Sequence, residues 1–288
     1  MPAFNSALTI DSTIESLLQQ SFDDFELIVS DNASTDGTGK ILQDFAARDP
    51  RVRVFHQPTN IGANLNYSAV VRLARGRYFK WASSSDWCAP DFLRLCVAIL
   101  DTRADVVLAY PRTRLFQQDP ANARDYEFDV DLQDSSPANR LARVVHDFRL
   151  NNAMNGLIRT DALRRTRLIE HYPSGDVVLM GHLALLGKLL LLPDALYYRR
   201  MEPETATNLM DAKAVERHHY PTATLRALFP NWKLHLGWLR VVLSVPMTWR
   251  ERRHTIATVS RMCRWRWRDL VGDLTAAVRF FLPHSRRG

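Results

Sequence analysis

The sequence is poor in cysteine and has no long apolar run. Cys88, Cys96 and Cys263 are the only cysteines in 288 residues, and they have neither metal-ligand spacing nor a paired framework. We therefore expect free thiols in a reducing cytoplasm. No stretch reaches the roughly 18 apolar residues that a membrane-spanning helix needs. Residues 1–5 also lack the basic and apolar regions of a signal peptide. These absences predict a soluble or peripheral protein.

Two further absences restrict the function. No Gly-x-Gly-x-x-Gly follows any predicted strand, which argues against a dinucleotide-dependent dehydrogenase. No motif for DNA or RNA binding is visible, although 38 Lys and Arg outnumber 31 Asp and Glu to give a formal net charge of +7. Because the basic excess gathers near the C-terminus, we expect an anionic membrane surface or a nucleotide substrate as its partner, and no nucleic acid.

What the sequence does contain is a repeated alternation of strand and helix. An apolar run at 25–29 and a polar–apolar alternation at 51–55 are typical of strands, and another strand begins at Tyr78. Segments 39–47 and 63–74 between them have helical spacing. Further strands are expected at 106–110 and 189–192, helices at 137–150 and 176–187, and a loop at 117–136. This order predicts an α/β fold with a doubly wound, mostly parallel sheet flanked by helices.

A carboxylate stands where the strand at 25–29 ends. Asp31 comes just after Val29 and before a Ser, Thr and Gly-rich turn. In open α/β sheets, ligands bind outside the carboxyl ends of the strands, so a ligand role is favoured for Asp31. Ser34 and Asp36 have two interpretations that the sequence leaves open, because both residue types also cap helices.

The segment Phe25–Thr38 resembles FEIIVVDDGSTDGT of family 2 glycosyltransferases, which are inverting, nucleotide-sugar-dependent enzymes of GT-A fold. The resemblance implies that Asp31 binds the nucleotide base or ribose. Residues 1–5 are similar to the end of the first family strand, whose tip lies under the nucleotide. The expected nucleotide-sugar contacts are therefore Pro2, Phe4, Asn5, Asp31, Ser34 and Asn60. Because almost nothing precedes Pro2, we expect the true translation start to lie upstream.

The sequence departs from the family at its metal motif. The resemblance places Ser83, Ser84, Ser85 and Asp86 at the D-x-D-D positions, counted back from Pro90. Carboxylates hold Mn²⁺ or Mg²⁺ far better than serine hydroxyls do. Three interpretations stay open: Asp86 holds a divalent cation, basic side chains replace the cation, or catalysis is impaired. In each of them Ser83, Ser85 and Asp86 line the donor site. Asp86 could instead only mark the start of the next helix.

The resemblance also implies a catalytic base. Gly175-Asp176 and the apolar helix after it are similar to the family's acceptor-side helix, in which Asp takes the proton of the acceptor hydroxyl. A purely structural role for Asp176 is a first-turn carboxylate favoured by the helix dipole. Glu202 follows the closing Tyr-Arg segment, and we hypothesise that it adds a carboxylate to the metal site.

The resemblance covers about two-thirds of the chain. It predicts a GT-A-like transferase domain over residues 1–205 and a helical extension over 206–288. The implied reaction moves a sugar from a nucleoside diphosphate sugar to a hydroxyl of a glycan or lipid-linked acceptor, as in polysaccharide biosynthesis. The alternative is a sugar-nucleotide or glycan-binding protein with impaired catalysis. The extension is rich in Arg and Trp between 237 and 281, which indicates either peripheral binding at the inner face of the membrane or a helical cap on the core.

Overall fold

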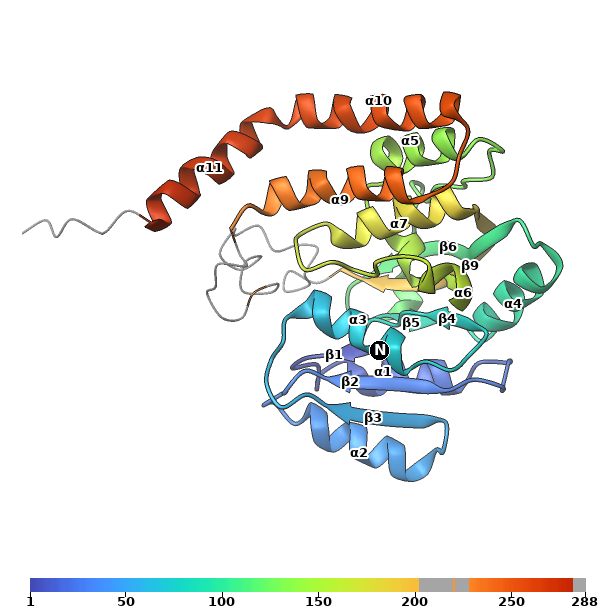
Figure 1. Cartoon of the computed structure of the whole chain (residues 1–288). Helices are drawn as coiled ribbons and strands as arrows, with labels where there is room; N and C mark the ends of the chain where they lie inside the picture. Colours follow the sequence, from blue (N-terminus) through green and yellow to red (C-terminus); the bar gives the residue numbers. More distant parts are fainter. Residues whose placement is uncertain (202–219, 221–227, 282–288) are drawn as a thin grey trace, which may run out of the picture.

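The computed structural model describes residues 1–201, 220 and 228–281. Within them, two sheets are surrounded by helices (Figure 1). The first sheet is parallel and has the order β1-β2-β3. Its strands are Pro2–Ala3, Leu27–Asp31 and Val52–His56. The pairing aligns Asp31 at the end of β2 with His56 at the end of β3. Polar residues that follow these strands are thereby collected at one edge of the sheet.

The second sheet is mixed and has the order β4-β8-β6-β9-β5, with β7 beside β6. Its strands are β4 Tyr78–Lys80, β5 Trp87–Cys88, β6 Val106–Phe116, β7 Arg124–Asp125, β8 Leu157–Arg159 and β9 Lys188–Arg200. Only β6 and β9 run parallel here, and the other pairs are antiparallel. The α/β class with flanking helices is confirmed, whereas the expected parallel pairing is limited to the first sheet and the β6–β9 pair.

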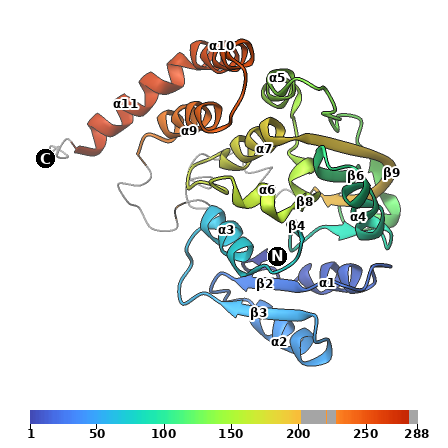
Figure 2. The ribbon, with the colours of Figure 1, turned by 45° about the vertical axis from the view of Figure 1, so that its right-hand side comes forward.

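Helices cover both sheets. In chain order they are α1 Ile10–Leu18, α2 Thr38–Arg48, α3 Ala63–Leu73, α4 Phe92–Thr102, α5 Pro137–Asp147, α6 Thr160–Arg164, α7 Gly175–Leu186, α9 Pro230–Ser244, α10 Trp249–Trp265 and α11 Trp267–Phe281. Two 3₁₀ turns, Pro120–Asn122 and Asn152–Asn155, lie between them. Figure 2 shows α2 and α3 on opposite sides of the β1–β3 sheet. None of the helices in the described part of the chain is long and apolar enough to cross a bilayer.

Several elements are longer than the sequence predicts. The strands expected at 106–110 and 189–192 continue to Phe116 and Arg200, because they pair with each other along most of their length. The segment expected as a loop, 117–136, includes a 3₁₀ turn and β7. It is also bonded to β6, because Tyr110 donates a hydrogen bond to the carbonyl of Val130 at 2.8 Å. Residues 212–228 also have helical spacing and are predicted to form a helix, but all of them except Tyr220 and Leu228 lie outside the described residues.

The C-terminal helices pack on the α/β body. Trp238 of α9 is 2% exposed and lies against α7, where a Cβ at Gly181 would come within 2.3 Å of the indole ring. Glycine at 181 is therefore what allows the two helices to approach so closely. Helix α10 packs against α5 and α9. Trp238, Val241 and Val242 belong to the same hydrophobic core as Leu183 of α7. The extension thus continues the core of the α/β body.

Candidate functional site

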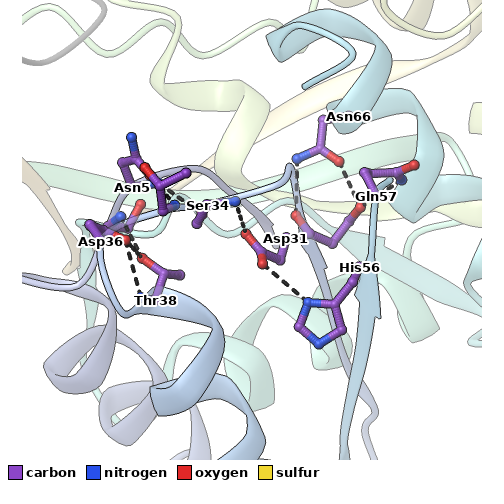
Figure 3. A network of polar contacts seen from close by, with 11 residues as sticks. Asn5, Asp31, Ser34, Asp36, Thr38, His56, Gln57 and Asn66 are labelled. Atoms are coloured by element: carbon purple, nitrogen blue, oxygen red, sulfur yellow. Dashed lines mark hydrogen bonds and ion pairs between the residues drawn. The ribbon is translucent and has the colours of Figure 1, made fainter. Parts of the chain in front are cut away.

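The edge formed by the C-terminal ends of β1, β2 and β3 carries a dense polar network (Figure 3). Asn5, just after β1, has a left-handed backbone with φ of 48°, a conformation that asparagine tolerates better than most residues. Its amide donates to Ser34 Oγ at 2.9 Å, and its Oδ1 accepts from the amide of Thr35 at 2.9 Å. These bonds fix the segment after β1 against the turn after β2.

Asp31 lies at the centre of this edge and is 4% exposed. Its Oδ1 accepts from the amide of Ser34 at 3.1 Å, and its Oδ2 lies 3.1 Å from Nδ1 of His56 (Figure 3). A carboxylate can accept about four hydrogen bonds, so these two contacts orient Asp31 without using its full capacity. The exposed imidazole of His56 and the hydrogen-bonded carboxylate of Asp31 together form a polar surface that is suited to a ligand rich in hydroxyl and N–H groups.

The next layer of the network fixes the loops around Asp31. Asn32 Nδ2 donates to Asn60 Oδ1 at 2.9 Å, which joins the turn after β2 to the segment before α3. Ser30 Oγ donates to Asn66 Oδ1 at 2.6 Å and accepts from Gln57 Nε2 at 3.0 Å. Asn60 is therefore held in place as part of the loop structure beside the predicted nucleotide site.

The structure separates the roles of Ser34 and Asp36, which the sequence left open. Ser34 Oγ bonds to Asn5 and gives no capping bond to α2. Asp36 accepts hydrogen bonds from Thr38 Oγ1 at 2.6 Å and from the amide of Ala7 at 3.0 Å. Slight burial opposes ionisation of Asp36, but the hydrogen bonds from Thr38 and Ala7 hold its pKa below the usual value. Asp36 thus stabilises the turn before α2.

The serine segment after β4 adjoins this edge. Ser84 Oγ lies 2.8 Å from Ser6 Oγ, and the carbonyl of Ser84 accepts from Thr9 Oγ1 at 2.9 Å. Ser83 and Ser85 bond to each other, with 3.1 Å between their hydroxyl oxygens. A continuous set of hydrogen bonds therefore leads from Asp31 through Ser34 and the residues after β1 to the serine segment.

Asp86 is buried and bonded to β9. Its Oδ2 accepts from the Tyr197 hydroxyl at 2.5 Å and its Oδ1 from the amide of Arg200 at 2.9 Å. Burial and the neighbouring Asp86 raise the pKa of Tyr197 well above its usual value, so this hydroxyl stays a donor. Asp86 does not mark a helix start, because β5 follows it and α4 begins only at Phe92. It joins the serine segment to β9.

A pocket of about 270 Å³ opens beside Asp86. Arg200 lies at its wall, and Arg200 Nε donates to the carbonyl of Ser85 at 3.0 Å. The pocket therefore combines a guanidinium with serine and carboxylate oxygens. Its lining residues are Ser12, Ser85, Asp86, Trp87, Phe116, Gln118, Asp119, Pro120 and Arg200.

Asp176 is the second residue of α7, and Asn151 Nδ2 donates to its Oδ2 at 2.8 Å. The other amide atom, Asn151 Oδ1, is buried and has no hydrogen-bond partner among the described residues. Burial raises the pKa of Tyr67 on α3 to about 12. The negative charges of Asp86 and Asp176 also raise this pKa, and the positive charge of Arg199 lowers it. The charges of both carboxylates thus act on this one buried hydroxyl.

The described residues fit a divalent cation poorly. No group of three His, Cys, Asp or Glu side chains in this part of the chain is arranged to hold a metal ion. Asp86 is the one carboxylate at the serine segment, and each of its oxygens already accepts a protein hydrogen bond. Glu202, the residue proposed to add a second carboxylate, lies outside the described residues.

Sequence reasoning missed several residues of this region. His56 could have been found, since it ends the strand that follows β2 along the chain. The contacts of Tyr67, Asn151, Tyr197 and Arg200 were not predicted, because they join segments between 25 and 115 residues apart or depend on a buried environment. Pro2 lies within β1 and is buried, and Phe4 is 45% exposed just after β1, so both lie at this edge. Their contact with a nucleotide sugar stays a prediction.

The curated proteins that are similar to this chain in sequence include a chondroitin synthase and a glycosyltransferase. Chondroitin synthase of Escherichia coli is 38% identical over 109 residues, which cover 38% of this chain and 16% of that protein. Glycosyltransferase GlyG of Streptococcus pneumoniae is 26% identical over 212 residues, 69% of each sequence. The chain thus spans only about a sixth of the length of chondroitin synthase.

A solved structure shares the fold. The S. aureus TarS fragment 1–349, crystallised in complex with UDP-GlcNAc, superposes with a TM-score of 0.65 at 17% identity and covers 92% of this chain and 71% of that one. At that identity the likeness shows the fold alone, which is of GT-A type. The family model described as glycosyl transferase family 2 matches residues 1–172, more than half of the sequence. On this match and the fold, the chain belongs to glycosyl transferase family 2.

Proposed function

We propose that this protein transfers a sugar from a nucleoside diphosphate sugar to a hydroxyl group of a glycan or lipid-linked acceptor, with inversion at the anomeric carbon. The observation that carries the proposal is the polar edge around Asp31, continuous by hydrogen bonds with the serine segment and located in the part of the chain that matches the family. In α/β folds this edge is the usual place for a nucleotide.

In the proposed complex, Asp31 accepts hydrogen bonds from the base or ribose. The carboxylate is suited to this because Ser34 and His56 hold it in a fixed orientation. Pro2, Phe4 and Asn5 lie beneath the nucleotide, and Asn60 borders it. Preorganisation of this kind favours binding, since fewer side chains have to be immobilised when the ligand arrives.

Asp176 is the proposed general base. It would take the proton of the acceptor hydroxyl while that oxygen forms a bond to the anomeric carbon. The bond from the anomeric carbon to the phosphate oxygen breaks, and the nucleoside diphosphate leaves with the bonding electrons. Asn151 donates a hydrogen bond to Oδ2 of Asp176, which leaves Oδ1 to face the acceptor. General-base catalysis by a positioned carboxylate contributes typically 10²–10⁴-fold to a rate.

The diphosphate is assigned to the serine segment and the pocket beside it. Hydroxyls of Ser83 and Ser85 can donate to phosphate oxygens, and the guanidinium of Arg200 supplies positive charge at the same wall. Because the described residues do not form a cation site, no step of this mechanism is assigned to Mn²⁺ or Mg²⁺.

The direct test is a transfer assay with a panel of nucleotide sugars, with and without Mn²⁺, on wild-type protein and Asp176→Asn. We expect Asp176→Asn to lower the turnover number about 10²–10⁴-fold with little change in nucleotide affinity. Asp161→Asn is the matched control, because its side chain is 97% exposed on α6. Equal turnover in Asp176→Asn and wild type would remove Asp176 from the mechanism.

A second function is favoured by one observation, the neutral serines at the positions where the family has carboxylates. In this alternative, the protein binds a sugar nucleotide or glycan and has impaired catalysis. Nucleotide binding measured by thermal shift, combined with no transfer and no donor hydrolysis for any panel member, would support it. Donor hydrolysis that Asp176→Asn abolishes would exclude it.

A further inference from the structure

Helix α9 exposes a stripe of large apolar side chains that the α/β body does not cover. Trp232, Leu236, Leu239 and Leu243 are between 40 and 57% exposed. Their spacing of four, three and four residues places them on one side of the helix. The opposite side of α9, with Leu234, Trp238 and Val241, is buried in the core. Helix α9 is therefore apolar on both faces, although only one of them packs on the α/β body.

Helix α11 repeats the same pattern. Trp267, Val271, Leu274 and Val278 have the identical spacing and are between 46 and 57% exposed. In both views α11 leads away from the α/β body, beyond the N-terminal end of α9 (Figures 1 and 2). We call these eight residues of α9 and α11 the apolar surface. A monomeric soluble protein rarely leaves so many large apolar side chains in water without using them.

The helices α9 and α11 are joined by specific contacts. The buried carboxylate of Asp273 on α11 accepts from the amides of Asn231 and Trp232 at 2.8 and 3.1 Å. These are the first amides of α9, where a negative charge is also favoured by the helix dipole. Trp232 Nε1 donates to the carbonyl of Leu270 at 3.0 Å. The orientation of α11 against the first turn of α9 is thus set by hydrogen bonds.

Helix α10, which packs against α9, carries exposed charges of one sign. Arg250, Arg253, Arg261 and Arg264 are all exposed on α10, and no exposed residue of that helix is acidic. Exposed tryptophans, Trp249 and Trp265, stand at the two ends of the same helix. Arg266 and Arg268 continue the basic sequence into α11, although Arg266 is paired with Asp269 at 2.8 Å. Basic side chains and tryptophan beside an apolar stripe are the properties of helices that lie in the interface of an anionic membrane.

We propose that α9, α10 and α11 attach this protein to an anionic lipid surface. The apolar surface would enter the boundary between headgroups and acyl chains, and the arginines would contact lipid phosphates. A second copy of the chain is a poorer occupant, since a symmetric contact through the same face would bring the arginines of the two copies together. The inference does not depend on glycosyl transfer, because lipid binding is measured without any substrate.

The test is flotation of the full chain with vesicles of phosphatidylcholine, alone or with about one-third phosphatidylglycerol. We expect binding to the anionic vesicles only, and release at high salt because the attraction is screened. Arg264→Gln should lower the partition coefficient about fivefold. The double variant Leu239→Gln/Leu274→Gln should lower it at least tenfold, since two apolar side chains are lost from the contact.

Matched controls carry the same substitutions elsewhere. Leu8→Gln changes a leucine that is 98% exposed outside these helices, and Arg72→Gln changes an exposed arginine on α3. Both should float like wild type. The proposal would be overturned if wild-type protein did not float with anionic vesicles. It would also be overturned if the double variant floated as well as wild type. The surface would instead be assigned to a second copy of the chain by a different result. In that case wild type does not float, light scattering shows that it is a dimer, and Leu239→Gln/Leu274→Gln dissociates the dimer.

Discussion

His182 lies at the contact between α7 and α9, and it makes the stability of this protein dependent on pH. The imidazole is 4% exposed, and its Nε2 lies 3.4 Å from Ser244 Oγ at the end of α9. Burial, and to a smaller extent the charge of Arg165, lowers the pKa of His182 from 6.5 to about 4. The folded protein therefore holds this ring neutral at a pH where the unfolded chain protonates it.

The sign and the magnitude follow from proton linkage. Because the folded-state pKa is the lower one, the stabilisation is complete above pH 6.5 and is lost as the pH falls towards 4. With one pKa unit equivalent to about 1.4 kcal/mol, lowering the pH from 7 to 5 should remove about 2 kcal/mol from the free energy of unfolding through this residue. The full effect, about 3 kcal/mol, is reached only below pH 4.

The assay is urea denaturation of wild type and His182→Gln at both pH values. Other titrating groups affect both proteins alike, so the difference between their pH responses isolates His182. We expect wild type to lose about 2 kcal/mol more than the variant between pH 7 and 5. His254→Gln on the exposed side of α10 is the control and should keep the wild-type response. Identical pH responses in wild type and His182→Gln would refute the reasoning.

Three further predictions concern the core and the site. Trp238→Ala should lower the free energy of unfolding by about 3–5 kcal/mol in chemical denaturation, and a loss below about 1 kcal/mol would contradict the packing of α9 on α7. Gly156→Ala should cost about 1–3 kcal/mol because the new Cβ would lie 2.7 Å from Tyr110 Cβ, whereas Gly272→Ala, with nothing within 4 Å, should cost none. Asp31→Asn should weaken nucleotide binding about tenfold or more in calorimetry, since a charged acceptor is lost, and unchanged affinity would place the nucleotide elsewhere.

Much of the fold could be predicted from local patterns. The apolar run at 25–29 and the helical spacing at 39–47 predict a strand and a helix, which the structure has at Leu27–Asp31 and Thr38–Arg48. Pairing direction could not be predicted, because whether β8 runs against β6 depends on contacts between residues about 50 positions apart. The same reason explains why β6 and β9 are longer than expected, since each strand is extended by pairing with the other.

The candidate site was predictable where its residues come from one segment. Asp31, Ser34 and Asn5 were identified from short motifs, and the structure bonds them into one network. Asp86 was identified as well, but its bonding to Tyr197 and Arg200 was not, because β9 reaches it from more than 100 residues away. The environment of Asp176 was equally hidden, since Asn151 contacts it from 25 residues away in the chain. The roles of these residues in binding and catalysis stay predictions.

The close approach of Trp238 to Gly181 has a consequence for how the protein can be divided. The same helix, α7, carries Asp176 at its start and receives the indole of α9 in its middle. A fragment that stops near residue 205 would therefore open a groove along α7 to water and loosen the helix that orients the carboxylate. A minimal active fragment should retain at least α9 and α10. Shorter fragments are expected to lose turnover although they keep every reacting group, because α7 would no longer be packed against α9.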